Sequence, residues 1–112
     1  MAAAVYTLAN VNGYTTPIGS RALGIRKLSW NTGTYANPAG YAASRQSFGL
    51  RGFDTAWGGI SAGGHYRVDA QIVSGPGGAT VNFRLFILST GVEVANGAAL
   101  TADSVTVGAI GG

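Results

Sequence analysis

The chain has 112 residues with seven basic and four acidic side chains, so 10% of its residues are charged, against about a quarter in typical globular domains. It contains no cysteine, which excludes a disulfide scaffold and any cysteine-ligated metal site. The net charge of +3 comes without a basic run, since only Arg26 and Lys27 are adjacent, and we expect no specific nucleic-acid partner. The length predicts one domain that covers residues 1–112.

The shortage of charge favours contacts with other subunits. A small monomer exposes a large share of its surface and normally keeps it soluble with many charged side chains. This chain has a hydrophobic content of 46% and 19 glycines instead. The alternative is a polar but uncharged surface built from Ser, Thr, Asn and Gly. Of the two, we expect extensive assembly contacts.

No segment has the pattern of a targeting or membrane segment. The N-terminal "MAAAVYTLAN" lacks a basic region, and its apolar stretch is broken at Tyr6 and Thr7. The strongest apolar run, Leu85 to Leu88, is far shorter than the roughly 18 residues of a membrane helix. We therefore expect a soluble protein, made in a cytoplasm and without a membrane partner.

The pattern of apolar residues predicts an all-β fold. Helical spacing does not persist, whereas short alternating runs recur between glycine, proline and asparagine residues. We expect a single small β-sandwich or β-barrel of short antiparallel strands with glycine-rich loops. In chain order, the expected strands are Val5 to Ala9, Leu23 to Trp30, Ser47 to Phe53, Tyr66 to Val73, Thr80 to Leu88, Gly91 to Val94 and Ser104 to Ile110. Between the second and third strands, Thr32 to Ala43 is expected to form a long ordered or interacting loop.

Two stretches of the chain resemble each other. "SRALGIRKLSW" covers Ser20 to Trp30, and "SRQSFGLRGFDTAW" covers Ser44 to Trp57. Each runs Ser-Arg, a bulky apolar residue, Gly, a branched apolar residue, Arg and finally Trp. A duplication and a coincidence are both open, and the unequal internal spacing favours coincidence. Either origin predicts two equivalent β-segments, in which Gly24 and Gly49 mark a bulge or a close backbone approach.

The clearest expected element is a hairpin made of "YRVDAQIV" and "TVNFRLFIL". If its loop is symmetric about Pro76 and Gly77, residues whose numbers sum to 153 lie opposite each other. The apolar residues of both runs then share one face. The same register places Asp69 opposite Arg84 on the other face, so we expect an ion pair between them.

The chain carries no constellation that predicts catalysis. Gly59 to Gly63 ("GISAG") matches the G-x-S-x-G nucleophile elbow with Ser61 as nucleophile, but that mechanism needs a histidine that follows an acid, and the only histidine is His65. We interpret this segment as a glycine-rich turn. Gly75 to Gly78 lacks the lysine and the helix of a phosphate-binding loop and is interpreted as the hairpin turn. The acidic residues have no metal-ligand spacing, so we expect no enzyme activity, no metal and no cofactor.

Aromatic residues lie near several of the glycine-rich turns, where their rings could stack on sugars or on bases. The favoured interpretation is that the two tryptophans are buried in the core or in an interface. The aromatic residues in such positions are Tyr14, Trp30, Tyr35, Tyr41 and Trp57.

The chain resembles small virion proteins of tailed bacteriophages, in particular all-β capsid decoration (cement) proteins. The resemblance lies in the charge-poor, Gly/Ala-rich β pattern and in the tail from Phe83 to Gly112, "FRLFILSTGVEVANGAALTADSVTVGAIGG". There a strand, a Thr-Gly turn, a short "EVANG" segment and a Val-rich strand follow one another. The resemblance implies a protein of the outer capsid surface, made in the host cytoplasm, that forms a trimer or dimer. It would bind the major capsid protein and stabilise the assembled head by bridging capsomers.

Two other functions are alternatives: a carbohydrate-binding or fibre-tip recognition module that uses loop aromatics, and an OB-like single-strand binder that uses arginine and tyrosine. For any interface we expect contacts from the N-terminal segment and the Thr32 to Tyr41 loop, because both are poor in charge and contain tyrosine, a residue enriched in interfaces. Two arginines at strand edges are expected to pair with carboxylates of the shell. The expected interface residues are Tyr6, Tyr14, Arg21, Tyr35, Tyr41 and Arg45.

Overall fold

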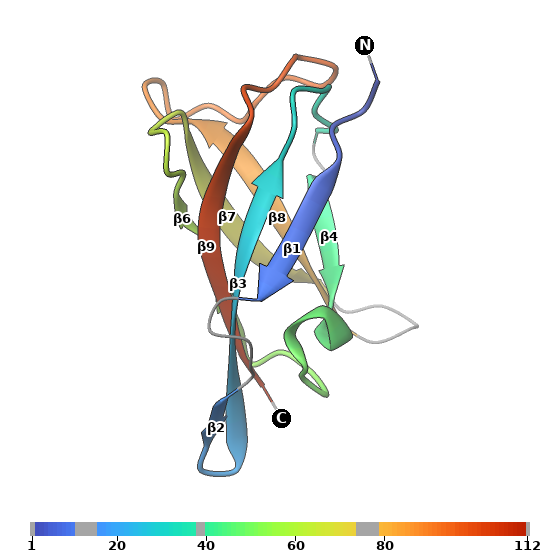
Figure 1. Ribbon diagram of the computed structural model, residues 1–112, viewed down its shortest axis with the longest axis vertical. Coiled ribbons are helices and arrows are strands. Elements are labelled where there is room, and N and C mark those ends of the chain that lie inside the picture. The colour runs from blue at the N-terminus through green and yellow to red at the C-terminus, as the bar shows by residue number, and fades with distance from the viewer. Residues whose placement is uncertain (1, 11–15, 38–39, 74–78, 112) are drawn as a thin grey trace.

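Two antiparallel sheets face each other and confirm the all-β fold (Figure 1). The structure is a computed structural model and describes residues 2–10, 16–37, 40–73 and 79–111. The first sheet has the order β1 (Tyr6–Asn10), β3 (Arg21–Trp30), β9 (Asp103–Gly111), β5 (Thr55–Trp57), with β2 (Thr16–Ile18) also paired to β3. The second has the order β4 (Tyr41–Ser44), β8 (Thr80–Ile87), β7 (Tyr66–Val73), β6 (Gly59–Ile60). One 3₁₀ turn, η1 (Arg45–Phe48), follows β4.

The central ladder of the first sheet joins β3 to β9. Nine residue pairs connect them, from Ala22 opposite Gly111 to Trp30 opposite Asp103. On the other side of β3, β2 pairs with its first residues and β1 with its last. The β2–β3 hairpin therefore projects beyond the rest of the sheet, at the lower end of Figure 1.

The predicted hairpin register is confirmed, while the predicted ion pair is wrong. β7 and β8 pair from Tyr66 opposite Ile87 to Val73 opposite Thr80, and Asp69 lies opposite Arg84 as expected. The Asp69 carboxylate instead accepts from Arg67, at 3.1 and 3.2 Å. Arg84 binds both carboxylate oxygens of Glu93, because the chain after β8 turns back and places Glu93 beside Phe86. The predicted turn at Gly75 to Gly78 lies outside the described residues.

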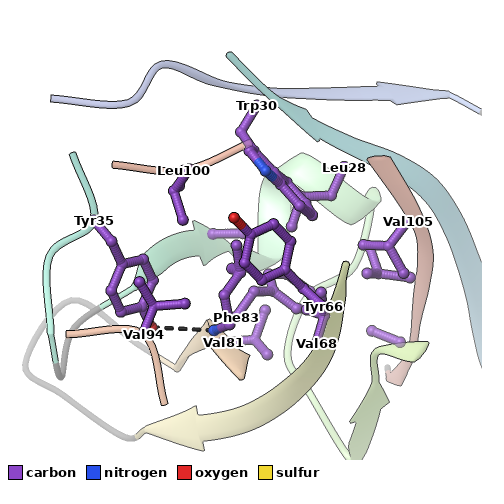
Figure 2. Packing of buried hydrophobic residues seen from close by; sticks show 14 of the residues in the cluster. Leu28, Trp30, Tyr35, Tyr66, Val68, Val81, Phe83, Val94, Leu100 and Val105 are labelled. Atoms are coloured by element: carbon purple, nitrogen blue, oxygen red, sulfur yellow. Dashed lines mark hydrogen bonds between the residues drawn. The ribbon is translucent and has the colours of Figure 1, made fainter. Parts of the chain in front are cut away.

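The core fills the space between the sheets. Trp30 lies there, and its indole N–H donates to the Thr101 carbonyl at 2.9 Å, which satisfies the polar atom of a buried ring. Its ring contacts Tyr66 edge-on, with centroids 5.9 Å apart (Figure 2). The interpretation of the tryptophans as buried is thus correct for Trp30, whereas Trp57 is 39% exposed. The largest fully buried side chains are Tyr35, Phe48, Phe83, Leu28, Leu85, Leu100, Val68, Val81 and Val107.

The two similar stretches have different structures, which corrects the expectation of equivalent strands. The first forms β3, but Ser47 to Phe53 is not a strand. Its beginning belongs to η1, and Gly49 caps that turn in the left-handed conformation, at φ 69°. The expected strand at Gly91 to Val94 is likewise reduced to one isolated bridge to β8.

The two stretches nevertheless pack against each other. Gly24 faces Phe48, as the expected close backbone approach requires, and a Cβ on Gly24 would lie 2.6 Å from the Phe48 carbonyl oxygen. Beside it, Arg26 is 5% exposed and donates from Nε to the Ser47 carbonyl at 3.0 Å, with its guanidinium over the Phe48 ring. Burial lowers the pKa of Arg26. η1 is therefore held on β3 by a contact that only glycine permits.

The sheets are joined along one side and open along the other. On the joined side, β5 runs through Gly58 into β6, so one segment crosses between the sheets. On the opposite side, β1 and β4 are the outer strands (Figure 1). Within the described part of the chain, no helix is long and apolar enough to cross a membrane.

Replacing Gly24 by alanine tests the contact between the two stretches. We expect Gly24→Ala to lower the free energy of unfolding by about 1 to 3 kcal/mol, because the new methyl group meets backbone that cannot rotate away. Gly52→Ala is the matched control, since among the described residues other than its chain neighbours no atom lies within 4 Å of a Cβ there. Urea unfolding of both variants measures the difference, and equal stabilities would contradict the packing described here.

Candidate functional site

The open side of the sandwich is the candidate functional site. β1 and β4 border it, and each has a hydrogen-bonded neighbour on only one side among the described strands. Neither β1 ("YTLAN") nor β4 ("YAAS") contains a charged residue or a proline. Soluble monomers commonly protect their edge strands with such residues, because an unprotected edge offers unpaired N–H and C=O groups to another chain.

Tyr6 and Tyr41 meet on this open side. Their rings stack with centroids 5.0 Å apart and an interplanar angle of 23°, so the pair bridges β1 and β4. Both side chains are half-buried. The Tyr6 hydroxyl is buried without a hydrogen-bond partner in the described residues, and burial, together with the nearby Tyr66, raises the pKa of Tyr6. A buried hydroxyl without a hydrogen bond lowers the stability of the fold. The hydrogen-bonding capacity of Tyr6 is therefore left unused on this side of the core.

The expected interface residues divide into four groups, of which Tyr35 is the last. The structure brings Tyr6 and Tyr41 together on the open side, and their place in an interface stays a prediction. Arg21 and Arg45 lie elsewhere, at the end of the sandwich that carries η1. Arg21 forms an ion pair with Asp54 at 3.1 Å, and both side chains are about half exposed. Tyr14 lies outside the described residues.

Tyr35 is a core residue, which corrects its expected place in an interface. It is 1% exposed. Its hydroxyl donates to Glu93 Oε2 at 2.7 Å and accepts from the Leu85 N–H at 3.1 Å. Figure 2 shows the Tyr35 ring among the buried side chains, next to Val94. Backbone hydrogen bonds between Tyr35 and Gly97–Ala98 hold the loop after β3 against the segment that precedes β9. Burial is the largest of the effects that raise the pKa of Tyr35.

Glu93 completes a network that sequence reasoning missed. It accepts from Tyr35 and from both Nε and a terminal nitrogen of Arg84. The Arg84 hydrogen bonds hold the pKa of Glu93 below its ordinary value, although burial acts against them. The network joins the loop after β3, β8 and the segment after β8. No local sequence signal could have identified it, because Tyr35 and Glu93 are 58 positions apart.

The "GISAG" segment is a turn only in its second part, because Gly59–Ile60 form β6 and the residues from Ser61 onward begin the turn that follows it. Ser61 is 3% exposed, and its Oγ accepts from the N–H groups of His65 and Tyr66. Asp103 accepts from the N–H groups of Gly63 and Ser104, each at 2.8 Å, and its other oxygen lies 2.9 Å from His65 Nδ1. The serine thus lies in a strand–turn–strand and not in the strand–turn–helix of a nucleophile elbow.

Asp103 is the electrostatic centre of this turn. Burial by itself would raise the pKa of Asp103, but hydrogen bonds from His65, Ser61 and two backbone amides outweigh it and hold the pKa well below its ordinary value. The ionised carboxylate therefore fixes the β6–β7 turn onto the beginning of β9.

Trp57 is the exposed tryptophan: it is 39% exposed and so is not a core residue, while its expected burial in an interface stays a prediction. A Cβ on Gly108 would lie 2.2 Å from Trp57 Cζ2 and 2.6 and 2.8 Å from the two ring atoms bonded to it. These distances describe a point above the ring face, so the indole lies face-on against the backbone of β9. A shallow open groove runs beside it, with Ile60, Arg67 and Asp69 along its wall. The groove thus places the Trp57 ring beside the aliphatic side chain of Ile60 and the polar pair Arg67–Asp69.

Among the described residues, no group of three or more His, Asp or Glu side chains could hold a metal ion. Comparisons of the chain with protein-family models, with curated proteins and with solved structures found no match. The function is therefore inferred from the geometry and chemistry of the chain itself.

Removing the charge of Asp103 tests the turn network. We expect Asp103→Asn to destabilise the protein by about 1 to 3 kcal/mol at neutral pH. The folded-state pKa of Asp103 lies below the unfolded value of about 3.9, so its stabilisation is present above that value and is lost as the pH falls through the folded-state pKa. Thermal unfolding against pH should show the difference between variant and wild type shrinking below about pH 4.

Asp69→Asn is the control for this experiment, because Asp69 is half exposed and its pair with Arg67 is expected to contribute little. A loss of stability equal to that of Asp103→Asn, or one independent of pH, would contradict the assignment.

Proposed function

We propose that the protein is a structural assembly protein, specifically a decoration (cement) protein that binds the outer surface of a bacteriophage head. The observation that carries the proposal is the open side, where two uncharged, unprotected edge strands flank the stacked pair Tyr6–Tyr41. A second subunit can extend either sheet there through backbone hydrogen bonds. The resemblance of the chain to phage decoration proteins supplies the identity of the particle.

Exposed apolar side chains support an assembly role. Val5, directly before β1, is 63% exposed beside the open side. Further large apolar side chains on the described surface are Trp57, Ile60, Val73, Ile87, Leu88 and Val92. A chain with 10% charged residues has little charge with which to offset this surface. Contacts with neighbouring subunits would remove it from water.

The mechanism would be thermodynamic linkage. A protein that binds the assembled, expanded shell and not its free subunits lowers the free energy of the shell by mass action. A dimer or trimer bound at several points gains further from the high effective concentration of its second and third contacts. The shell would thereby resist the internal pressure of its DNA without any chemical step.

Charge placed on the edge strands tests the proposal. We expect the wild type to sediment as a dimer or trimer at tens of micromolar and to co-sediment with heads purified from the same source. Ala42→Lys, on the exposed face of edge strand β4, should weaken one or both associations at least about tenfold, because an edge lysine opposes strand addition. Thr106→Lys is the matched control, since it adds the same charge to an exposed position of β9, which has neighbours on both sides.

Sedimentation velocity and head pelleting measure these outcomes. A clean wild-type monomer that does not pellet with heads would refute the proposal. Equal effects of the two lysine variants would show that assembly does not use the open side.

A second candidate function is favoured by one observation, the exposed Trp57. An aromatic ring with one face fixed against backbone and the other side open can stack on a sugar ring, and Arg67 and Asp69 supply hydrogen-bonding groups in the adjacent groove. The loop aromatics expected for a carbohydrate-binding module are less suitable, because Trp30 and Tyr35 are buried.

A glycan array separates this candidate from the first. We expect any saccharide ligand to be lost on Trp57→Ala and partly retained on Trp57→Phe, because phenylalanine preserves a stacking face. The indole fluorescence of Trp57 should change on binding, whereas that of buried Trp30 should not. No bound glycan for the wild type would exclude saccharide recognition at this groove.

A further inference from the structure

The charges of the protein are distributed unevenly between its two ends. Four arginines and one aspartate lie in, next to or against η1 and the β2–β3 hairpin. These two elements lie at the lower end of the molecule in Figure 1. The other three basic residues are matched in number by the other three acidic residues, so the whole net charge of +3 belongs to this end. We call it the basic end, and it comprises Arg21, Arg26, Arg45, Arg51 and Asp54.

The two similar stretches build the basic end. Each contributes a Ser-Arg pair and a second arginine after its glycine, namely Arg21 and Arg26 from the first, and Arg45 and Arg51 from the second. The contact between Gly24 and Phe48 packs the two stretches together. The two similar stretches do not form equivalent strands, but their packing brings four arginines to the same end of the molecule.

The arginines of the basic end are not equally available to a partner. Arg26 is buried and contributes only to the electric field. Arg21 is shared with Asp54 in an exposed pair. Arg45 and Arg51 form no ion pair within the described residues, because the remaining carboxylates are bound elsewhere: Asp69 to Arg67, Glu93 to Arg84 and Asp103 to His65. Arg45 and Arg51 thus carry the uncompensated charge of this end that a partner can reach, whereas Lys27, which is exposed and likewise forms no ion pair among the described residues, lies on the outer face of the first sheet.

We propose that the basic end docks on a carboxylate-bearing protein surface, with Arg45 and Arg51 as its contact residues. Arginine is enriched in protein interfaces and binds carboxylates through two parallel hydrogen bonds. The surroundings favour protein over nucleic acid, because single-strand binding relies on stacking rings, and the nearby Phe48 is fully buried. Three or four charges also release too few counterions for firm nucleic-acid binding at physiological salt.

This docking face differs from the open side. The open side offers strand edges to a second copy of the chain, whereas the basic end offers charge to an acidic surface. The inference rests on the proposed function only for the identity of the partner, which would be an acidic patch on the shell. Copies joined through their open sides would then present several basic ends to it.

Two variants with equal charge changes test the proposal. Arg45→Gln with Arg51→Gln removes two positive charges from the basic end, and Lys27→Glu changes the net charge by the same amount on the outer face of the first sheet. Binding of each to immobilised polyglutamate, a carboxylate probe, is measured by interferometry across a salt series. We expect the double variant to bind roughly fivefold to tenfold more weakly than wild type, and Lys27→Glu to change binding much less.

Further measurements make each outcome decisive. Arg51→Gln alone should show part of the loss, so the test does not depend on half-buried Arg45. Equal losses for the double variant and Lys27→Glu would overturn the proposal, as would tighter binding to single-stranded oligothymidine than to polyglutamate at physiological salt. If wild type pellets with heads and the double variant pellets equally well, the docking face is wrong while the proposed function stands. If wild type does not pellet with heads but the polyglutamate result holds, the proposed function fails and the basic end remains.

Discussion

The nine-pair ladder between β3 and β9 is the constraint on which the rest of the structure depends. Alternate residues of both strands point between the sheets, so the ladder supplies Leu28, Trp30, Val105 and Val107 to the core. β1 and β2 attach to the free side of β3, and β5 attaches to the free side of β9. The ladder therefore positions the surfaces for which a function is suggested: β1 borders the open side, and β5 carries Trp57.

Polar networks stabilise one end of the sandwich, whereas apolar side chains fill the space between its sheets. At one end, Tyr35, Glu93 and Arg84 join the long loop to β8. Near the same end, Asp103 holds the β6–β7 turn. These networks use two of the four acidic residues of the chain, and Asp69 is bound by Arg67. Three carboxylates therefore have their partners away from the basic end, and the surplus of arginine is left at that opposite end. Structural use of the acids therefore creates the charge asymmetry.

The open side follows from the strand order, which leaves two edge strands without a second neighbour among the described strands. A sandwich closed on one side by the crossing from β5 to β6 leaves β1 and β4 as edges on the other. Tyr6 and Tyr41 fill the gap between them with aromatic area, but they add no charge that would discourage another strand. Self-association through this side and docking through the basic end are compatible, because the two surfaces use different residues.

The sequence by itself determined the all-β class and the full register of the β7–β8 hairpin. It could do so because strands that follow one another along the chain pair through a short loop, and alternation then allows one register only. Tertiary structure alone decided the partners of Asp69 and Arg84, the burial of Tyr35 and the non-strand conformation of Ser47 to Phe53. For Tyr35 and for Ser47 to Phe53 the physical reason is distance along the chain, because Glu93 contacts Tyr35 from 58 positions away and Phe48 contacts Gly24 where the two sheets pack together. Asp69 and Arg84 bind partners only two and nine positions away, but which charged group each one meets depends on how the segment after β8 folds back. A side chain cannot reveal from its neighbours in sequence which distant residue will cover it.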